Sequence, residues 1–598
     1  MHRRMPWYIT TWSVALAALC AAVGLPPETG AQEEAEPTTD FFETVEVNVV
    51  NVEVYVTDKK GEPVTGLTAE DFEIYEDGEP MEITNFYVAR GEAAATPEIE
   101  VPAAPAAEPA AAGPDLPPPD DQQLNVVLFI DNLNIRPASR NRVLDALRGS
   151  LFFQLGPGDR VMLASFNGGA VEIRQGLTGD PDQLVPAIEE LIQVNPRGAH
   201  SQLDRLAILR ELQQTDLEQD ASAGGVGLSQ GGTIDWEGMR MGIQAYAERE
   251  YQKIARTVDV LTDFVDALSG IPGRKALIYV SDGLSLHPGE ALLHAWDAKS
   301  GGGRSAVSVE SLARDYDATG LFEDLGRHAN ANRVTFYTVL ASGGQAATLT
   351  PAERSAFFSL DQPTTLGQVW NERLEAMETS NLRGSMKIMA DATGGLATLS
   401  TTAIGSALQR LRRDFETYYS LGYVPPDPAA SVNHKIKVKA RDKSLRVRHR
   451  EGYRARTTDE RMTGRVQSAL MFDSEDNPLG VVVGFGDEKK DEKGRYLVPI
   501  TVKFPIANLL LLPQEHFHEG RVSIFVGARD SQGGTSPIQK MPAPIRIPND
   551  KLLTALAQVA GFRVTLMMNE GEHSVVVGVR DELGNVESTT RVSHTPGS

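Results

Sequence analysis

The sequence predicts a multi-domain protein with a central doubly wound α/β sheet, flanked by a small N-terminal β module and a C-terminal β-sandwich. Three observations lead to this fold class. The chain has 598 residues, enough for three or four domains that each bury a core. Continuous apolar runs alternate with helical periodicity between residues 124 and 424, whereas short alternating strands dominate on either side. A hydrophobic content of 41% and a charged content of 23% are ordinary globular values, which excludes wholesale disorder.

Residues 1–31 have the layout of a secretory signal peptide. Basic residues at positions 2–4 precede an apolar run over 12–25, and Ala31 follows at a cleavage spacing. The run is shorter than the ~20 residues that a spanning helix needs, and no other run is long enough to span a bilayer. The only cysteine, Cys20, lies in this segment, so a chain cleaved after Ala31 has no thiol. We therefore expect export to the periplasm or the cell exterior.

Residues 42–90 are expected to form a small β module. Valines at 45, 47 and 49, and then at 52, 54 and 56, alternate with polar residues, and Gly61 and Gly78 end two turns. The segment 91–123 that follows contains eight prolines, seven acidic residues and no Lys or Arg. Such a composition cannot form a core, so this segment is expected to be an extended linker.

The region 124–457 carries the α/β pattern. Residues 125–130 are an apolar run that ends at Asp131, as expected of a central parallel strand covered on both faces. Further strands are expected over 161–166, 170–173, 276–280, 333–340 and 418–424, and helices over 143–155 and 254–268. Strands alternating with helices indicate a doubly wound sheet.

A basic segment over 435–456 and a β-rich region over 461–598 complete the chain. The segment contains ten Lys or Arg residues, and Lys435, Lys437 and Lys439 alternate with apolar residues. This alternation favours the solvated face of a hairpin over a surface that binds an anionic partner. About seven short strands over 461–598 suggest a β-sandwich with a pattern similar to immunoglobulin-like modules.

Composition and motifs argue against several functions. The net charge of −24 opposes nucleic acid as the main partner, and a single cysteine excludes Cys-ligated metal sites. His516 and His518 are expected at an edge or loop rather than in a metal site. Ser285 lies in a segment superficially similar to a nucleophile elbow, but the final glycine is missing. Walker A, HExxH and dinucleotide fingerprints do not occur, so we expect no enzymatic activity.

Three stretches of the α/β region, 127–131, 156–161 and 272–283, resemble a von Willebrand factor A-type domain. Two flanking regions resemble the corresponding parts of the VWFA-related family best known from Acidobacteria: 66–78, and 418–423 followed by 435–438. The resemblance covers residues 42–457. It implies a von Willebrand A-like, Rossmann-type sheet over 124–457, with insertions and a basic β exit segment.

The resemblance also implies a divalent-cation site at the carboxyl edge of the sheet. The family's pattern is Asp-x-Ser-x-Ser after the first strand, a Thr on a later loop and an Asp after the fourth strand. Asp131, Thr233 and Asp282 match three of these positions, whereas Leu133 and Ile135 replace the two serines. Because Mg²⁺ needs oxygen ligands, we expect a vestigial site, no resident cofactor and at most weak Mg²⁺ binding.

The expected function is that of an exported, non-enzymatic binding protein in protein–protein interaction or adhesion, whose partner the sequence does not name. Two alternatives stay open: an exported hydrolase that uses Ser285 or Asp282, and a structural spacer of an envelope assembly. Insertions over 197–235, 284–325 and 341–379 exceed what the sheet requires. We expect them to form a partner-binding rim at the carboxyl edge, which includes Trp236 and Trp296.

Overall fold

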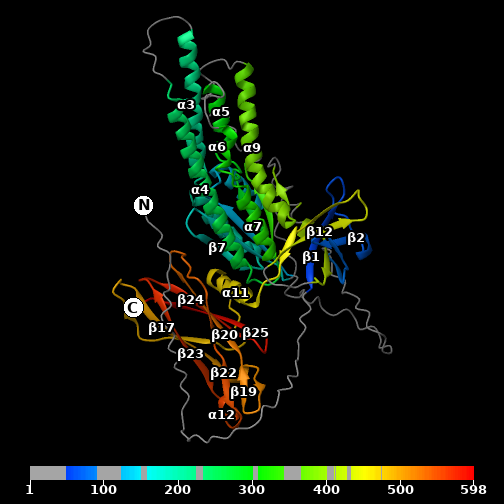
Figure 1. The fold of residues 1–598 in the computed structure, drawn as a ribbon, viewed down its shortest axis with the longest axis vertical. Coiled ribbons are helices and arrows are strands. Elements are labelled where there is room, and N and C mark those ends of the chain that lie inside the picture. The colour runs from blue at the N-terminus through cyan, green and yellow to red at the C-terminus, as the bar shows by residue number, and fades with distance from the viewer. Residues whose placement is uncertain are drawn as a thin grey trace, which may run out of the picture.

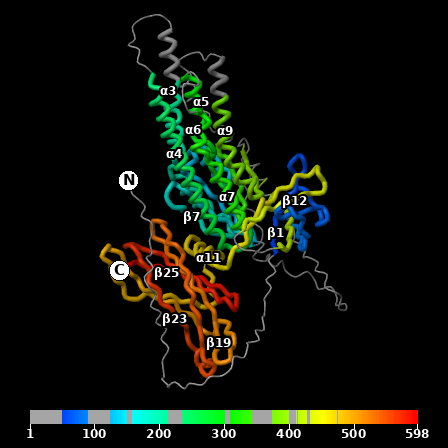
Figure 2. Tube along the Cα trace, viewed as in Figure 1, coloured from blue at the N-terminus to red at the C-terminus, as the bar shows by residue number. Residues whose placement is uncertain are grey.

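The computed structural model describes most of the chain, which forms a central α/β body and two β-rich bodies (Figures 1 and 2). The described residues are 49–89, 123–149, 158–223, 234–300, 308–342, 365–399, 410, 413–415, 417–426, 432–472 and 475–597. The expected signal peptide, almost all of the 91–123 linker and Thr233 lie outside them. Within these ranges, no helix has both the length and the apolar character needed to cross a membrane.

A six-stranded mixed sheet lies at the centre of the α/β body. Its strands are β5 (Leu124–Asp131), β6 (Arg160–Phe166), β7 (Val171–Thr178), β8 (Arg274–Ser281), β9 (Val334–Leu340) and β10 (Ala397–Thr398). Their order is β10-β9-β8-β5-β6-β7, and β7 alone is antiparallel to its neighbour. The chain therefore proceeds from β5 toward one edge and from β8 toward the other, as in a doubly wound sheet.

Helices cover both faces of this sheet. They are α1 (Pro137–Gly149), α2 (Leu184–Gln193), α4 (Trp236–Leu268), α7 (Thr319–Ala331) and α9 (Thr365–Thr393). On one face, α1 and α2 bury Leu144 and Ile188 in a core shared with Leu128. On the other face, α4 and α7 bury Leu261 and Phe322 in a core shared with Phe129. Alternate residues of β5 thus supply both cores, which explains its continuous apolar run.

A helical cap extends beyond the carboxyl edge of the sheet (Figure 1). It consists of α3 (Ala199–Ala223), α5 (Glu290–Ser300), α6 (Val309–Arg314) and the adjoining parts of α4 and α9. The cap has a hydrophobic core of its own, which includes Ile243, Leu292, Trp296 and Leu312. The described parts of the three predicted insertions thus supply much of this helical layer.

The N-terminal sandwich combines two distant parts of the chain. One sheet has the order β13 (Arg446–His449), β1 (Val50–Thr57), β11 (Tyr418–Tyr423), β4 (Asn85–Ala89). The other has the order β14 (Gly452–Arg454), β12 (Asn433–Ala440), β2 (Phe72–Glu76), β3 (Glu79–Met81). Their shared core includes Val52, Ile74, Leu421 and Val438.

This sandwich corrects two expectations from the sequence. Residues 42–90 do not form a module alone, because β1 pairs with β11 and β13 while β2 pairs with β12. The strand expected over 418–424 joins this sandwich, and β10 takes the sixth place in the central sheet. Alternation along a strand shows that one face is buried but does not identify the strand's neighbour.

The C-terminal region packs two antiparallel sheets around one core that includes Val498, Val502, Ile524 and Val577. One sheet contains β15 (Val482–Phe485), β16 (Lys489–Lys490), β17 (Tyr496–Pro505) and β23 (Val559–Met568). The other contains β20 (Val522–Asp530), β21 (Gln539–Pro542), β24 (His573–Asp581) and β25 (Val586–His594). A small third sheet contains β18 (Leu512–Pro513), β19 (Phe517–Gly520) and β22 (Ile545–Pro548), and α12 (Leu552–Leu556) follows β22.

Helix α11 (Thr458–Phe472) joins this region to the central body, where only short strands were expected over 461–598. Its residues Met462, Val466 and Leu470 bury against Phe525 and Val576 on the outer face of the β20–β24 sheet. Near the C-terminal end of α4, the backbone at Gly270 approaches α11 so closely that a Cβ atom would lie 2.5 Å from the Gly464 carbonyl oxygen. A side chain at position 270 would therefore separate the two helices.

Candidate binding site at the carboxyl edge of the central sheet

The candidate site lies where β5 and β8 end side by side. These neighbouring parallel strands lead to connections that run toward opposite edges of the sheet. The loops that follow them therefore diverge and leave a crevice, which is where open α/β sheets bind their ligands. Asp131 ends β5 and Asp282 directly follows β8, so the fold places two of the three predicted site residues at this point.

Asp131 is fully buried, and its carboxylate is occupied by hydrogen bonds. Oδ1 accepts from the backbone N–H groups of Leu133 and Asn134, both at 3.1 Å. Oδ2 accepts from Asn134 Nδ2 at 2.8 Å and from the Tyr279 hydroxyl. Burial raises the pKa of Asp131, while the hydrogen bonds from Tyr279 and Asn134 oppose that shift. The chain itself thus supplies the donors that this carboxylate needs.

Asp282 is paired with an arginine from the β5–α1 loop. Its Oδ2 accepts from the backbone N–H of Arg136 at 2.9 Å and from Arg136 Nε at 2.8 Å. Asp282 Oδ1 is buried and has no hydrogen-bond partner among the described residues. The guanidinium therefore supplies the positive charge beside Asp282.

The two apolar residues of the predicted motif cannot act as metal ligands. Ile135 is fully buried in the core beneath α1 and α2, and Leu133 packs against the core on the other face. Neither side chain offers an oxygen to a cation. Thr233 lies outside the described residues. The described residues thus bring together Asp131, Asp282 and Arg136, and Arg136 belongs to no motif that the sequence shows.

A pocket of about 100 Å³ opens beside Asp282. It lies between the β5–α1 and β8–α5 loops and the helices α3, α4 and α9. Six charged residues line it: Arg136, Arg205, Glu250, Lys253, Asp282 and Glu378. Lys253 forms an ion pair with Glu250 at 2.7 Å, in addition to the pair between Arg136 and Asp282. Three positively charged side chains and three carboxylates therefore line this small pocket.

Several polar atoms of this pocket have no partner within the described chain. Arg205 is only 7% exposed, yet its Nε donates no hydrogen bond. The Ser285 hydroxyl and Asp282 Oδ1 are likewise buried without a partner. Burial raises the pKa of Glu378, and the nearby Arg205 opposes that shift. Buried donors and acceptors without partners are costly, so these atoms are suited to a polar group that enters the pocket.

The expected rim is present in part, but one of its two tryptophans is buried. Trp296 is 4% exposed, lies in the core of the helical cap and donates its indole N–H to the Trp236 carbonyl oxygen at 2.8 Å. Trp236 packs against the same core. Burial in the cap removes Trp296 from the expected partner surface. Trp236 is only partly buried, so its contact with a partner stays a prediction. Exposed apolar residues of the cap are instead Leu203 and Met241, both 59% exposed.

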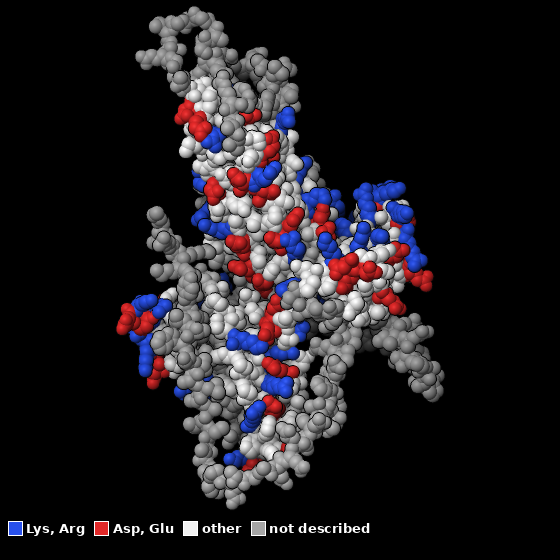
Figure 3. All heavy atoms as spheres, in the orientation of Figure 1, with Lys and Arg blue, Asp and Glu red and all other residues white. Residues whose placement is uncertain are grey.

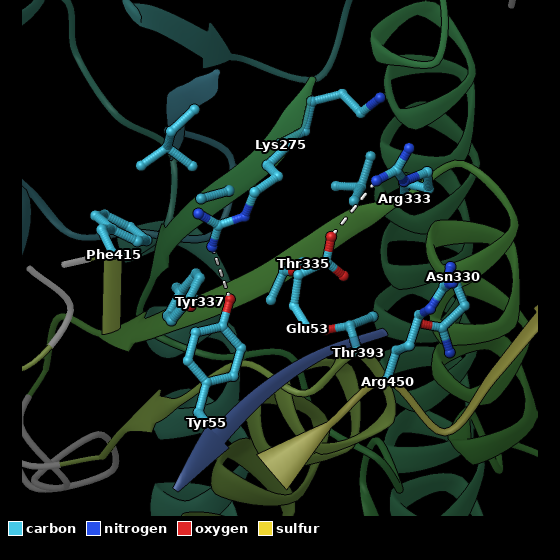
Figure 4. A pocket seen from close by; sticks show the side chains of 14 residues that line it. Glu53, Tyr55, Lys275, Asn330, Arg333, Thr335, Tyr337, Thr393, Phe415 and Arg450 are labelled. Atoms are coloured by element: carbon cyan, nitrogen blue, oxygen red, sulfur yellow. Dashed lines mark hydrogen bonds and ion pairs between the residues drawn. The ribbon is translucent and has the colours of Figure 1, made fainter. Parts of the chain in front are cut away.

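A second, smaller pocket of about 20 Å³ lies where β1 of the N-terminal sandwich meets the central sheet (Figure 4). Arg333 pairs with Glu53 at 3.5 Å, and Arg274 donates to the Tyr55 hydroxyl at 3.1 Å. Lys275 is 6% exposed, and burial together with Arg333 lowers its pKa to about 7. These contacts connect two bodies of the protein, so we assign this pocket to the joint between them.

Other residues singled out in the sequence lie apart from the pocket beside Asp282. In the small third sheet, Asn549 Oδ1 accepts a hydrogen bond from His518 Nδ1 at 2.9 Å, and the His516 side chain is 83% exposed. In β12, Lys435, Lys437 and Lys439 are exposed while Ile436 and Val438 are buried, which confirms the predicted alternation. Lys and Arg gather at one edge of the lobe that contains this strand (Figure 3).

Comparison with known proteins adds little to this geometry. No family profile and no curated protein match the chain. Among solved structures, a Northeast Structural Genomics Consortium target, SoR45, is similar at 17% sequence identity, with 20% of this chain and 90% of that chain covered. The TM-score of this match is 0.15.

Proposed function

We propose that this protein is an exported, non-enzymatic binding protein that holds a protein partner at the carboxyl edge of a von Willebrand A-like domain. The observation that carries the proposal is the pocket beside Asp282, in which buried polar atoms of Arg205, Asp282 and Ser285 have no partner within the described chain. The pocket opens at the position where doubly wound sheets bind ligands.

The strand order supports the von Willebrand A-like part of this proposal. β5 is the first strand of the sheet and β8 is the fourth in chain order, and they lie next to each other. Asp131 and Asp282 therefore meet at the edge where the sequence resemblance places a cation. The Arg136 guanidinium pairs with Asp282 there, so the proposed binding mode does not need a metal.

The geometry favours binding over hydrolysis. A serine nucleophile requires a base within hydrogen-bond reach, and Ser285 Oγ has no hydrogen-bond partner among the described residues. The nearby His287 instead has its Nδ1 3.6 Å from Asp317 Oδ1. A structural spacer is also less well supported, because a spacer has no use for buried polar atoms that lack partners.

Site-specific photo-crosslinking tests this proposal. A photoreactive residue at Leu203, on the α3 helix that lines the pocket, should capture a discrete protein from envelope extract. The same residue at Val559, which is 58% exposed on β23, is the matched control. We expect the yield of the Leu203 crosslink to fall at least tenfold in an Arg205→Ala background. Such a fall corresponds to about 1.4 kcal/mol of binding free energy, which is about the contribution of one hydrogen bond to a charged group. Equal capture at both positions, insensitive to Arg205→Ala, would contradict the proposal.

A further inference from the structure

A second cluster of polar side chains lies in the N-terminal sandwich, away from the pocket beside Asp282. Glu76 ends β2, Asp77 follows it in the turn to β3, and His434 lies near the start of the neighbouring strand β12. Asp77 and His434 line a groove of about 1280 Å³ between this sandwich and the helices α7 and α9. The cluster is therefore accessible from solvent along the groove.

Three potential ligand atoms converge in this cluster. His434 Nδ1 lies 2.9 Å from Asp77 Oδ2 and 3.2 Å from Glu76 Oε1, and all three atoms lie within 4.8 Å of one another. Around a tetrahedral Zn²⁺ with bonds of about 2.0–2.2 Å, neighbouring ligand atoms are about 3.3 Å apart. The two distances to the imidazole already approach that value. The Asp77 side chain is 52% exposed, so it can adjust to close the remaining gap.

Each ligand is held by a contact outside the cluster. The Tyr453 hydroxyl lies 3.2 and 3.3 Å from the two oxygens of Glu76, which is 3% exposed. The Lys435 backbone N–H donates to Asp77 Oδ1 at 2.8 Å and leaves Oδ2 facing the imidazole. The His434 ring stacks on the Tyr453 ring with centroids 5.1 Å apart. Such outer contacts orient metal ligands before an ion arrives.

A simple ion pair does not satisfy this cluster. His434 Nδ1 carries at most one proton, which two carboxylates share, and His434 Nε2 is buried with no partner among the described residues. Two carboxylate oxygens thus converge on a single imidazole nitrogen. A divalent cation would neutralise them and coordinate all three ligands at once.

We propose that Glu76, Asp77 and His434 form a site for a divalent transition metal such as Zn²⁺. One imidazole nitrogen and two carboxylate oxygens are a donor set for Zn²⁺ rather than for Ca²⁺ or Mg²⁺, which prefer oxygen alone. Three protein ligands leave a coordination position open toward the groove. When Nδ1 binds the metal, the ring proton lies on His434 Nε2.

Metal titration of the untagged, metal-stripped full chain tests the site. We expect one Zn²⁺ per chain by calorimetry. Co²⁺ should give the visible absorption of a four- or five-coordinate ion. Asp77→Asn and His434→Ala should each weaken Zn²⁺ binding at least tenfold, and neither Mg²⁺ nor Ca²⁺ should compete. His516→Ala, at an exposed histidine beside Glu515, is the matched control and should bind like the unchanged protein.

Two outcomes would overturn this site. One is the absence of Zn²⁺ binding up to millimolar concentration, in which case the three residues form an ion pair only. The other is binding that Asp77→Asn and His434→Ala leave unchanged, which would place the ion elsewhere. Far-UV circular dichroism of each variant shows whether it is folded. If His434→Ala does not fold, the exposed Asp77 still provides the decisive variant.

Discussion

At the scale of single residues, Asp131 shows how a buried carboxylate is satisfied without a cation. Its oxygens accept from two backbone N–H groups, an amide and a tyrosine hydroxyl, all from its own body of the protein. Two of these four donors are backbone N–H groups of the turn that follows β5. Asn134 contributes both its backbone and its side chain, which the adjacent strand-exit turn brings into reach.

Replacing this carboxylate should be costly. Asp131→Ala removes the buried carboxylate that accepts from the Tyr279 hydroxyl, from the Asn134 side chain and from two backbone N–H groups, so we expect a loss of about 2–4 kcal/mol in the free energy of unfolding. Urea unfolding followed by circular dichroism measures it. Asp145→Ala, on the exposed face of α1, should change stability by less than about 0.5 kcal/mol. An equal effect of both substitutions would show that the network around Asp131 contributes little.

Divalent-cation binding beside Asp282 should be weak, because Arg136 already pairs with this carboxylate. Calorimetric titration of an Asp77→Asn, His434→Ala variant, which lacks the proposed transition-metal cluster, should show no Mg²⁺ binding tighter than roughly millimolar, about 4 kcal/mol. Micromolar binding would contradict the vestigial-site interpretation. Leu133→Ser together with Ile135→Ser would supply the two hydroxyls of the von Willebrand A-type pattern that the sequence resembles. However, Ile135 is fully buried, so that variant should also lose about 2–4 kcal/mol of stability.

At the scale of elements, the N-terminal sandwich depends on strands from both ends of the central body. β1 and β4 flank β11, and β2 pairs with β12, so neither group of strands completes its sheet alone. An unpaired strand exposes both its apolar face and its backbone groups, which promotes aggregation. The basic alternation of β12 reflects this arrangement, because its apolar residues face the shared core.

A fragment comparison tests this interdependence. A fragment of residues 124–598 lacks β1–β4 and exposes core residues such as Leu421 and Val438, so we expect it to aggregate and to bind a hydrophobic dye. A fragment of residues 42–598 should be monomeric and bind little dye. Size-exclusion chromatography with dye fluorescence distinguishes the two. A monomeric, dye-silent 124–598 fragment would show that the exit strands fold without their N-terminal partners.

At the scale of the whole molecule, buried charges at the joint between the sandwich and the central sheet couple stability to pH. Lys275 has an ordinary pKa of 10.5 and a folded-state pKa of about 7, because burial and the nearby Arg333 and Arg456 disfavour its charge, while Glu53 opposes that shift. Between these values the unfolded chain binds more protons than the folded one. The contribution of Lys275 to the free energy of unfolding should therefore rise as the pH rises from about 7 to 10.5. The same contribution is lost as the pH falls through that window.

Unfolding experiments at several pH values can isolate this contribution. We expect Lys275→Met to flatten the pH dependence of the unfolding free energy between pH 7.5 and 9.5, by up to about 1.4 kcal/mol per pH unit. Lys437→Met, at an exposed position of β12, should leave the slope unchanged. If both variants keep the original slope, Lys275 is not the group that titrates in this window.

The sequence by itself determined the type of most elements and the position of Asp131 and Asp282 at strand ends. Local periodicity and composition carry that information, because each strand or helix must bury its own apolar face. Only the tertiary structure decided that distant strands complete the N-terminal sandwich, that Trp296 is buried and that Arg136 meets Asp282. It also brought together Asp77 and His434, which are 357 positions apart. Contacts between such distant residues depend on which surfaces pack together, and they leave no periodic pattern along the chain.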